Sequence, residues 1–392
     1  MMDPAASRSS RSDLLRVAIL EPYYGGSHAA FVEAVRERSR HRCVVATLPA
    51  RKWKWRMRGA AFWFARNDTA WMESSPEGPI DVILTCDMLS VADLRAMLPL
   101  ACRGIPIVCY FHENQLTYPI PFAQRRDYQY GMTNITSGAA ADVVWFNSAF
   151  HRDDFLAAAR SLLRQMPDFV PHGAVGEIAA KSRVLHPPIT APLRPRRTSP
   201  SGDAVPTILW SHRWEFDKNP RPFFEACARL DRMDVPYRLV CLGEKFRTAP
   251  DAFEMVHRRL AHRVRHSGHI PAREDYLAML ATCDLVVSTA IQENFGIAVI
   301  EAILAGCQPL LPNRMAYPGI IPRELHESCL YEGDEALFGR LRQAVMGSAR
   351  LESAEIERLQ ASLLDRFGAA SAIRAIDDAL SELVATRSLP RA

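Results

Sequence analysis

Short apolar runs, rich in branched residues, alternate along this chain with amphipathic segments of helix length. Runs of strand length occur at 15–21, 42–48, 81–86, 105–110 and 142–147, and again at 207–211, 237–243, 284–289 and 308–311. Continuous apolar strands that alternate with helices are typical of parallel sheets covered by helices on both faces. The sequence therefore predicts an α/β fold.

A proline-rich stretch interrupts this alternation near the middle of the 392 residues. Residues 187–203 contain five prolines and no apolar periodicity, which excludes a helix or a central strand. We predict an N-terminal Rossmann-like domain over 1–190, a linker over 191–203 and a C-terminal Rossmann-like domain over 204–392. The last segment, 353–386, has apolar residues at helical spacing and is expected to add no strand.

The composition is that of a folded globular protein, with 48% hydrophobic and 23% charged residues. No apolar run approaches the length that a membrane-spanning helix needs. The nine cysteines form no Cys-x-x-Cys pair and lie mostly in strand-like runs, which indicates buried thiols in a reducing compartment. Because the polar start lacks a secretory apolar stretch, we expect a cytoplasmic protein. A net charge of +4 leaves any nucleic-acid binding to local patches.

Polar residues that follow the predicted strands are the candidates for chemistry, because ligands of doubly wound sheets bind at those strand ends. After the first strand, Gly25 and Gly26 let the backbone approach a ligand, and His28 follows at a helix start that suits an anion. A glycine turn without a ligand explains these residues as well, and no dinucleotide or P-loop motif is present. After the fourth strand, His112 can donate to a phosphate or sugar oxygen, while Asn114 and Gln115 can orient hydroxyls.

Two cations follow the first strand of the second half. Arg213 and Lys218 can hold a diphosphate, the guanidinium as a fork and the ammonium as a point charge. Two solvated surface cations remain the alternative.

A turn and a helix follow the strand at 284–289. Glu293 precedes Asn294-Phe295-Gly296, a turn into a helix whose free amides suit an anion, and Glu301 lies about two turns further on. Two carboxylates at different distances from the cations that bind a diphosphate suggest a sugar-nucleotide ligand. One carboxylate would bind the transferred sugar and the other the ribose. Alternatively, Glu301 is the polar face of an otherwise apolar helix.

The sequence offers no typical metal site. No Asp-x-Asp motif occurs, so arginine, lysine and helix amides must neutralise the leaving group. His262, His266 and His269 have metal-like spacing but no carboxylate or thiol close by in sequence, so we interpret 258–270 as a solvated basic helix. We therefore expect no metal and no cofactor beyond the donor substrate.

Cations and indoles alternate between residues 51 and 58, a pattern that suits phosphate contacts and base stacking. The candidate RNA contacts are Arg51, Lys52, Trp53, Lys54, Trp55, Arg56 and Arg58. A period of two is equally typical of an edge strand, or of a loop packed on its own domain. The stretch is short for a membrane-surface helix.

These motifs together carry a family resemblance. The Arg213 and Lys218 pair and the Glu293-x7-Glu301 spacing, on two Rossmann-like halves, resemble retaining GT-B glycosyltransferases that use nucleotide-diphospho sugars. More narrowly, EPYYGGSH, LPARKWKWRMRGAAFWFA and YFHENQLTYP resemble the tRNA-queuosine alpha-mannosyltransferase family. The resemblance implies two facing Rossmann-like domains with a cleft between them, and transfer of mannose from GDP-mannose to queuosine in tRNA-Asp.

The resemblance also implies roles for the donor-site residues. Arg213 and Lys218 are expected to hold the diphosphate, and Glu301 to meet the ribose. Glu293 and the backbone of 294–296 are expected to hold the transferred sugar. Glu293 is then a positioning group or a nucleophile, and a front-face mechanism, with the donor phosphate as base, is implied.

On the acceptor side, the resemblance places His112 beside the reacting centre. The expected acceptor-side residues are Gly25, Gly26, His28, Asn114 and Gln115. Residue chemistry alone leaves two other functions open: a glycosyltransferase with a lipid or saccharide acceptor, and a non-catalytic RNA-binding protein of the same fold.

Overall fold

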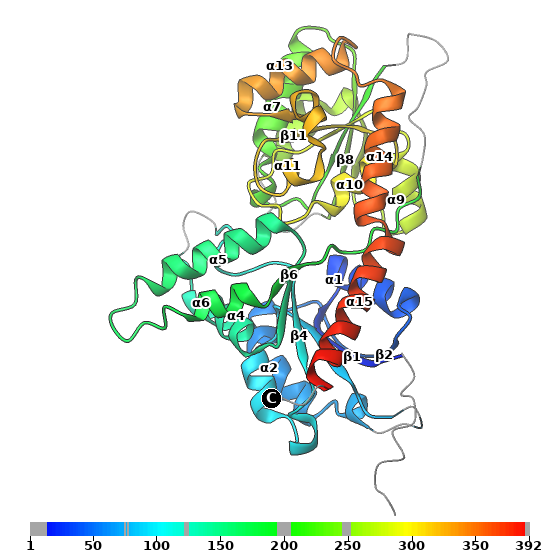
Figure 1. Cartoon of the computed structure of the whole chain (residues 1–392). Helices are drawn as coiled ribbons and strands as arrows, with labels where there is room; N and C mark the ends of the chain where they lie inside the picture. Colours follow the sequence, from blue (N-terminus) through cyan, green and yellow to red (C-terminus); the bar gives the residue numbers. More distant parts are fainter. Residues whose placement is uncertain are drawn as a thin grey trace, which may run out of the picture. The chain divides into compact units, whose positions relative to one another are not determined.

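The computed structural model describes residues 14–73, 76, 78–120, 125–193, 205–244 and 252–388, apart from the side chains of 255–257 and 388. The chain divides into two compact units (Figure 1). One contains the chain up to Tyr118, Arg126–Pro188 and the segment from Ala369 onward; the other contains Pro119–Arg125 and Ile189–Gly368. In the described ranges, no helix is both long and apolar enough to cross a membrane.

The first unit is built on a six-stranded parallel sheet with the order β2-β1-β3-β4-β5-β6. Its strands are β1 (Arg16–Tyr24), β2 (Arg42–Pro49), β3 (Val82–Cys86), β4 (Ile107–Phe111), β5 (Val143–Phe146) and β6 (Ser182–Val184). Its helices are α1 (Gly26–Arg38), α2 (Trp53–Arg66), α3 (Val91–Met97), α4 (Tyr128–Ala140), α5 (Ala149–Leu163), α6 (Ala174–Ala180) and α15 (Ala369–Ser388).

Both faces of this sheet are covered, which explains why its strands read as continuous apolar runs. Along β1, Val17 and Ile19 pack with residues of α1 and α15. Ala18 and Leu20 point to the opposite face and pack with residues of α2, α3 and α4. The alternation of side chains along a strand therefore serves two separate cores.

The C-terminal helix belongs to the first unit, which differs from the predicted boundary of 204–392 (Figure 1). In α15, Ile376 and Leu380 are buried in the core formed with α1 and β1. The Asp377 carboxylate accepts hydrogen bonds from Ser39 Oγ at 2.6 Å and from the backbone N–H of Arg40 at 2.9 Å. The apolar face of an amphipathic helix predicts that the helix packs on a sheet. It does not predict which of the two sheets the helix packs on.

The second unit contains a six-stranded parallel sheet with the order β12-β11-β10-β7-β8-β9. Its strands are β7 (Thr207–Ser211), β8 (Arg238–Leu242), β9 (Val264–Gly268), β10 (Leu285–Val287), β11 (Gln308–Pro312) and β12 (Leu330–Tyr331). Its helices are α7 (Pro220–Arg232), α8 (Ala252–Arg259), α9 (Arg273–Leu280), α10 (Ile297–Leu304), α11 (Tyr317–Ile320), α12 (His326–Cys329), α13 (Gly333–Val345) and α14 (Ser353–Phe367). Leu209 packs with residues of α10 and α14, whereas Ile208 and Trp210 pack with residues of α7 and α13.

The predicted strands and the helical C-terminal segment are confirmed, but two local predictions are wrong. The segment 258–270 is not a basic helix: α8 ends at Arg259, a short 3-10 helix covers Ala261–Arg263, and β9 follows as an edge strand. Asp231, distant in sequence, pairs with His262 Nε2 at 2.9 Å. Residues 264–268 adopt a strand conformation because they pair with β8. The local sequence pattern does not predict this pairing.

The basic-aromatic stretch at 51–58 is neither an edge strand nor a loop, because α2 begins at Trp53. The buried side of α2 consists of Met57, Ala60, Ala61, Phe64 and Ala65, at the three- and four-residue spacing of a helix. The predicted linker begins at Ala191, but residues 194–203 of it lie outside the described part of the chain.

Candidate active site

The two units each bring polar residues to the carboxyl edge of a sheet, at the point where strand order reverses. In the first unit β2 lies on one side of β1 and β3 on the other. In the second unit, β8 and β10 flank β7 in the same way. Such reversal points are where doubly wound sheets bind ligands.

In the first unit, Glu21 and His28 form a buried pair after β1. Glu21 Oε1 lies 3.2 Å from His28 Nδ1 and accepts from the backbone N–H of Tyr23 at 2.8 Å. Cys86 Sγ, at the end of β3, donates to the same oxygen at 3.4 Å. Burial alone would lower the pKa of His28, but the Glu21 charge outweighs it and raises that pKa to about 9. His28 is therefore a cation at neutral pH.

His112 follows β4 and stacks on His28, with 3.9 Å between ring centroids. Burial and the nearby His28 charge hold the pKa of His112 well below its usual range, so His112 is neutral. Its backbone N–H donates to Asp87 Oδ1 at 2.8 Å, and its carbonyl accepts from Asn147 Nδ2 at 2.9 Å. In the described part of the chain, His112 Nε2 and Asp87 Oδ2 are buried without a hydrogen-bond partner. A neutral imidazole with an unused nitrogen thus lies beside an imidazolium.

The other predicted acceptor-side residues are explained by the backbone conformation and hydrogen bonds of their own loops. A Cβ on Gly25 would lie 2.5 Å from the Cβ of Ala50, and Gly26 has a φ of 53°, so both positions favour glycine without any ligand. Asn114 is fully buried, and its Oδ1 accepts from the backbone N–H of Leu116 and Thr117 at 3.0 Å.

Gln115 is likewise engaged within the same loop. Its Nε2 donates to Glu113 Oε1 at 2.9 Å, and its backbone N–H donates to Asn134 Oδ1 at 2.8 Å. Together with Asn114, it shapes the loop that carries His112.

Among the residues that the structure describes, Glu21, His28 and Cys86 also form a group that could hold a metal ion, since one ligand atom of each lies within 4.8 Å of the others. All three are buried and already bond to one another through Glu21 Oε1. Neither Glu21 nor Asp87 was among the site residues predicted from the sequence. Asp87 directly follows the predicted strand 81–86, so its place at a strand end was the signal that could have found it.

In the second unit, Lys218 lies at the centre of a charged cluster. Its Nζ donates to the carbonyl of Gln292 at 2.7 Å and lies 3.2 Å from Asp217 Oδ2 and 3.5 Å from Glu293 Oε2. Burial alone would lower the pKa of Lys218, but the charges of Glu293 and Asp217 raise it above its ordinary value. The structure therefore brings together Lys218, after β7, and Glu293, after β10, and keeps the ammonium charged.

The turn before α10 has a conformation that requires glycine. Gly296 has a φ of 95°, and a Cβ there would lie 2.9 Å from Ile320 Cδ1. Gly296 precedes the first turn of α10 and has no side chain with which to cap it, so the amides of that turn are left for another acceptor. Phe295 is buried, and Asn294 Oδ1 accepts from Gln292 Nε2 at 2.9 Å. The backbone of this turn, more than its side chains, is therefore the part that could bind a ligand.

Glu301, two turns into α10, is not an isolated carboxylate. It is buried and pairs with Arg273, at the start of α9, whose guanidinium is half exposed. Ser211 Oγ lies 3.3 Å from Tyr276 OH, one turn after Arg273. Arg273 was missed because nothing near it in sequence distinguishes it from the other arginines. Arg213 is exposed, and its Nη2 lies 3.1 Å from Glu215 Oε2.

On α2, both the aromatic and the basic side chains predicted to bind RNA include exposed members. Trp55 is 65% exposed, and Phe62 and Trp63, both about two turns further along the helix, are 57% and 46% exposed. Trp53 instead packs on Tyr130, with 5.1 Å between ring centroids.

The cations around α2 differ in how they are held. Arg51 and Lys52 precede the helix and are exposed, and Lys54 Nζ lies 5.6 Å from the ring centroid of Trp53. Arg56 Nε donates to the carbonyl of Pro49 at 3.3 Å, and Arg58 Nη2 to Gln129 Oε1 at 2.9 Å.

Comparison with known proteins gives a consistent result. Residues 16–189 match the family model described as tRNA-queuosine alpha-mannosyltransferase N-terminal, and residues 195–343 match glycosyl transferases group 1. The Drosophila melanogaster tRNA-queuosine alpha-mannosyltransferase is 36% identical over 339 residues, which cover 83% of this chain and 85% of that protein. The chain belongs to the tRNA-queuosine alpha-mannosyltransferase family.

Solved structures resemble this member of the tRNA-queuosine alpha-mannosyltransferase family in fold. Sucrose-phosphate synthase from Thermosynechococcus elongatus has a TM-score of 0.69 at 16% identity, covering 95% of this chain and 100% of that one. HepE from Anabaena, in complex with UDP, has a TM-score of 0.67 at 15% identity, covering 94% of this chain and 100% of that one. The predicted GT-B architecture is confirmed, and the chain is a glycosyltransferase.

Family membership decides against the non-catalytic alternative. The N-terminal family model spans the Glu21, His28 and His112 cluster together with α2, and the glycosyltransferase model spans Lys218 and Glu293. The features of the mannosyltransferase family and those of the wider glycosyltransferase group are thus carried by different units.

Proposed function

We propose that this glycosyltransferase transfers mannose from GDP-mannose to queuosine in tRNA-Asp, with retention of configuration. The observation that carries the proposal is the match of residues 16–189, which contain the His28 and His112 pair and α2, to the family's N-terminal model. The 36% identity to the Drosophila mannosyltransferase over most of both chains supports the same substrate. A tRNA acceptor also accords with a cytoplasmic protein.

For the donor, we assign the diphosphate to Lys218, Arg213 and the first-turn amides of α10. An ammonium kept charged by Glu293, the exposed guanidinium of Arg213 and a helix N-terminus together oppose the charge of the leaving GDP. These groups make a metal cofactor unnecessary in the proposed mechanism. Glu301, oriented by Arg273, accepts hydrogen bonds from the ribose hydroxyls.

For the sugar, we assign mannose to Glu293 and the backbone of 294–296. The bond between mannose C1 and the β-phosphate oxygen breaks, and a queuosine hydroxyl adds to C1 on the face that GDP leaves. The hydroxyl proton passes to the departing phosphate. Glu293 stabilises positive charge developing on the sugar, and His112 contributes its unused Nε2 to the same centre.

For the RNA, we assign α2 as a contact surface. The exposed rings of Trp55, Phe62 and Trp63 suit base stacking, and the cations at 51, 52 and 54 suit phosphates. Neutralising the cations at 51–58 is expected to weaken tRNA binding and flatten its salt dependence while donor hydrolysis stays unchanged. Unaltered tRNA binding would show that this stretch is structural.

The deciding experiment incubates the protein with GDP-mannose or UDP-glucose and with tRNA that contains or lacks queuosine, and then analyses digested nucleosides by mass spectrometry. A hexose on queuosine from GDP-mannose alone is the expected result. Glu293→Gln should abolish the product, while Glu324→Gln, an exposed residue of the same unit, should not. Transfer only to a lipid or saccharide, or from UDP-glucose alone, would overturn the proposal.

A further inference from the structure

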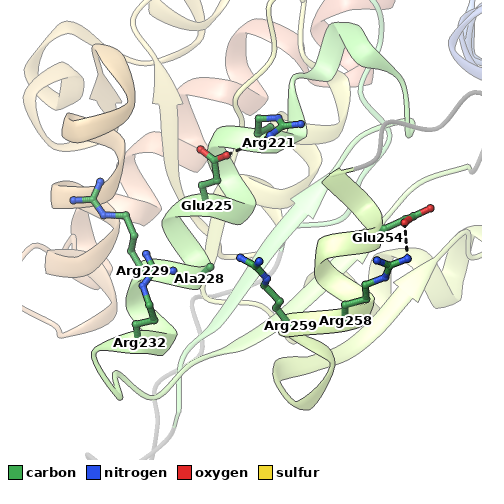
Figure 2. A pocket seen from close by; sticks show the side chains of 8 residues that line it. All are labelled: Arg221, Glu225, Ala228, Arg229, Arg232, Glu254, Arg258 and Arg259. Carbon is green, nitrogen blue, oxygen red and sulfur yellow. Dashed lines mark ion pairs between the residues drawn. The ribbon is translucent and has the colours of Figure 1, made fainter.

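A basic hollow lies on the second unit between α7 and α8 (Figure 2), and none of the described residues that border it is assigned to the donor. Its volume is about 560 Å³. Five arginines and two glutamates border it, an excess of three positive charges. The arginines are Arg221, Arg229 and Arg232 on α7, and Arg258 and Arg259 on α8. We call this feature the arginine groove.

The α7 side of the arginine groove is a straight row. Arg221, Glu225, Arg229 and Arg232 follow one another at spacings of four, four and three residues, which places them on one face of the helix. From the first to the last, the row spans roughly 16 Å at about 1.5 Å per residue. In sequence, the row begins three residues after Lys218.

The arginines differ in how firmly they are held. Arg229 is fixed by two hydrogen bonds to Glu335, at 2.6 and 2.9 Å, and lies 3.7 Å from the ring centroid of Phe338. Arg221 and Arg258 each form an exposed ion pair with a glutamate one turn away on the same helix, at 3.7 and 3.2 Å. Exposed pairs of this kind are weak, and a stronger anion replaces them readily.

Arg232 and Arg259 have no ion pair or hydrogen bond within the described ranges of the chain, and both are exposed. Figure 2 shows Arg259 reaching from α8 toward the α7 row. Two unengaged guanidiniums from different helices therefore border one hollow. Exposed guanidinium groups without an ion pair are suited to binding phosphate, because they offer parallel N–H donors to its oxygens.

The shape and chemistry of the groove favour a linear polyanion. A lining of charged side chains, with Ala228 the sole apolar residue among those that border the hollow, offers little to an apolar ligand. A row of this length meets several phosphates of one nucleic-acid strand, because phosphates repeat every few ångströms along it. We propose that the arginine groove binds the phosphodiester backbone of the RNA substrate, at nucleotides other than the one modified. The identity of that RNA as a tRNA rests on the proposed function above.

The test compares two double variants with the same loss of charge. Arg232→Gln/Arg259→Gln alters the groove, and Arg323→Gln/Arg358→Gln alters two exposed arginines of the same unit outside it. Affinity for tRNA is measured between 50 and 200 mM salt. We expect the groove variant to bind about five- to tenfold more weakly at low salt, and its log–log salt slope to fall by about 1.4 to 1.8, for two lost phosphate contacts. The control variant should match the wild type within about twofold.

Hydrolysis of GDP-mannose without acceptor separates this proposal from the proposed function, because it should be the same in all three proteins. If the wild type binds tRNA but never mannosylates it, the acceptor assignment fails, and the binding comparison still decides the groove. Equal tRNA affinity and salt slope in the two double variants would overturn the groove proposal. Tighter binding of poly-glutamate than of tRNA, lost in the groove variant, would assign the groove to an acidic protein and would also overturn it.

Discussion

The charge of His28 should depend chiefly on Glu21, with smaller contributions from Asp87 and Glu113. The Nδ1 to Oε1 distance is 3.2 Å, and both side chains are buried. The rise in the His28 pKa from 6.5 to about 9 corresponds to about 3 kcal/mol in favour of the cation, at about 1.4 kcal/mol per pH unit. Because the folded pKa is the higher one, this contribution to stability is complete below pH 6.5 and is lost as the pH rises through about 9.

Glu21→Gln keeps the size of the side chain and removes the charge. Burial is then opposed only by the weaker effects of Asp87 and Glu113, so the pKa of His28 should fall below about 9. At pH 7.5 the protonated fraction of His28, about 97% for a pKa of about 9, should drop in the variant. An NMR titration of protein with labelled histidine measures this directly, and His28→Gln assigns the signal.

His151 serves as the internal control. Burial lowers its pKa to about 3, and its Nδ1 lies 2.9 Å from Asn147 Oδ1, so it should stay neutral from pH 5 to 10 in both proteins. A His28 signal that titrates near pH 9 in Glu21→Gln would refute the reasoning, because the cation would then owe its stability to other groups.

Three further predictions concern the second unit. Lys218→Gln should lower kcat/KM for the donor about 10- to 100-fold in steady-state kinetics, through loss of a charged contact to the diphosphate, and an unchanged value would contradict that role. Arg273→Gln should raise the donor KM about three- to tenfold with kcat nearly constant, because Glu301 loses the partner that orients it; a change confined to kcat would argue against ribose binding. Gly296→Ala should destabilise the protein by about 1–3 kcal/mol in a thermal melt, whereas Gly339→Ala in α13, where a Cβ meets nothing within 4 Å, should not. Equal melting temperatures for the two glycine variants would contradict the strain argument.

Much of the fold was predictable because burial on both faces of a parallel sheet leaves a local mark. Val82–Cys86, Ile107–Phe111 and Thr207–Ser211 are buried at every position, so each reads as an apolar run. Lys218 and Glu293 could be paired in advance because both follow strands, and parallel strands end at the same edge of a sheet.

Short edge strands could not be predicted, because they lack a continuous apolar run in the sequence. Ser182–Val184 and Leu330–Tyr331 contain too few residues to show a period, and Val264–Gly268 is only partly buried. In α2 the alternation of cations and indoles at its start was conspicuous, but the three- and four-residue spacing of Met57, Ala60 and Phe64 determined the helix.

The sequence by itself therefore determined the class of fold, the positions of most strands along the chain and the strand ends at which chemistry is possible, because these depend on burial patterns within a few residues. Tertiary structure alone decided that α15 packs on the first sheet, that Asp87 anchors the loop of His112, and that Arg273 meets Glu301. The physical reason is distance: hydrogen bonds and ion pairs act over a few ångströms, and only the folded chain brings residues far apart in sequence that close together.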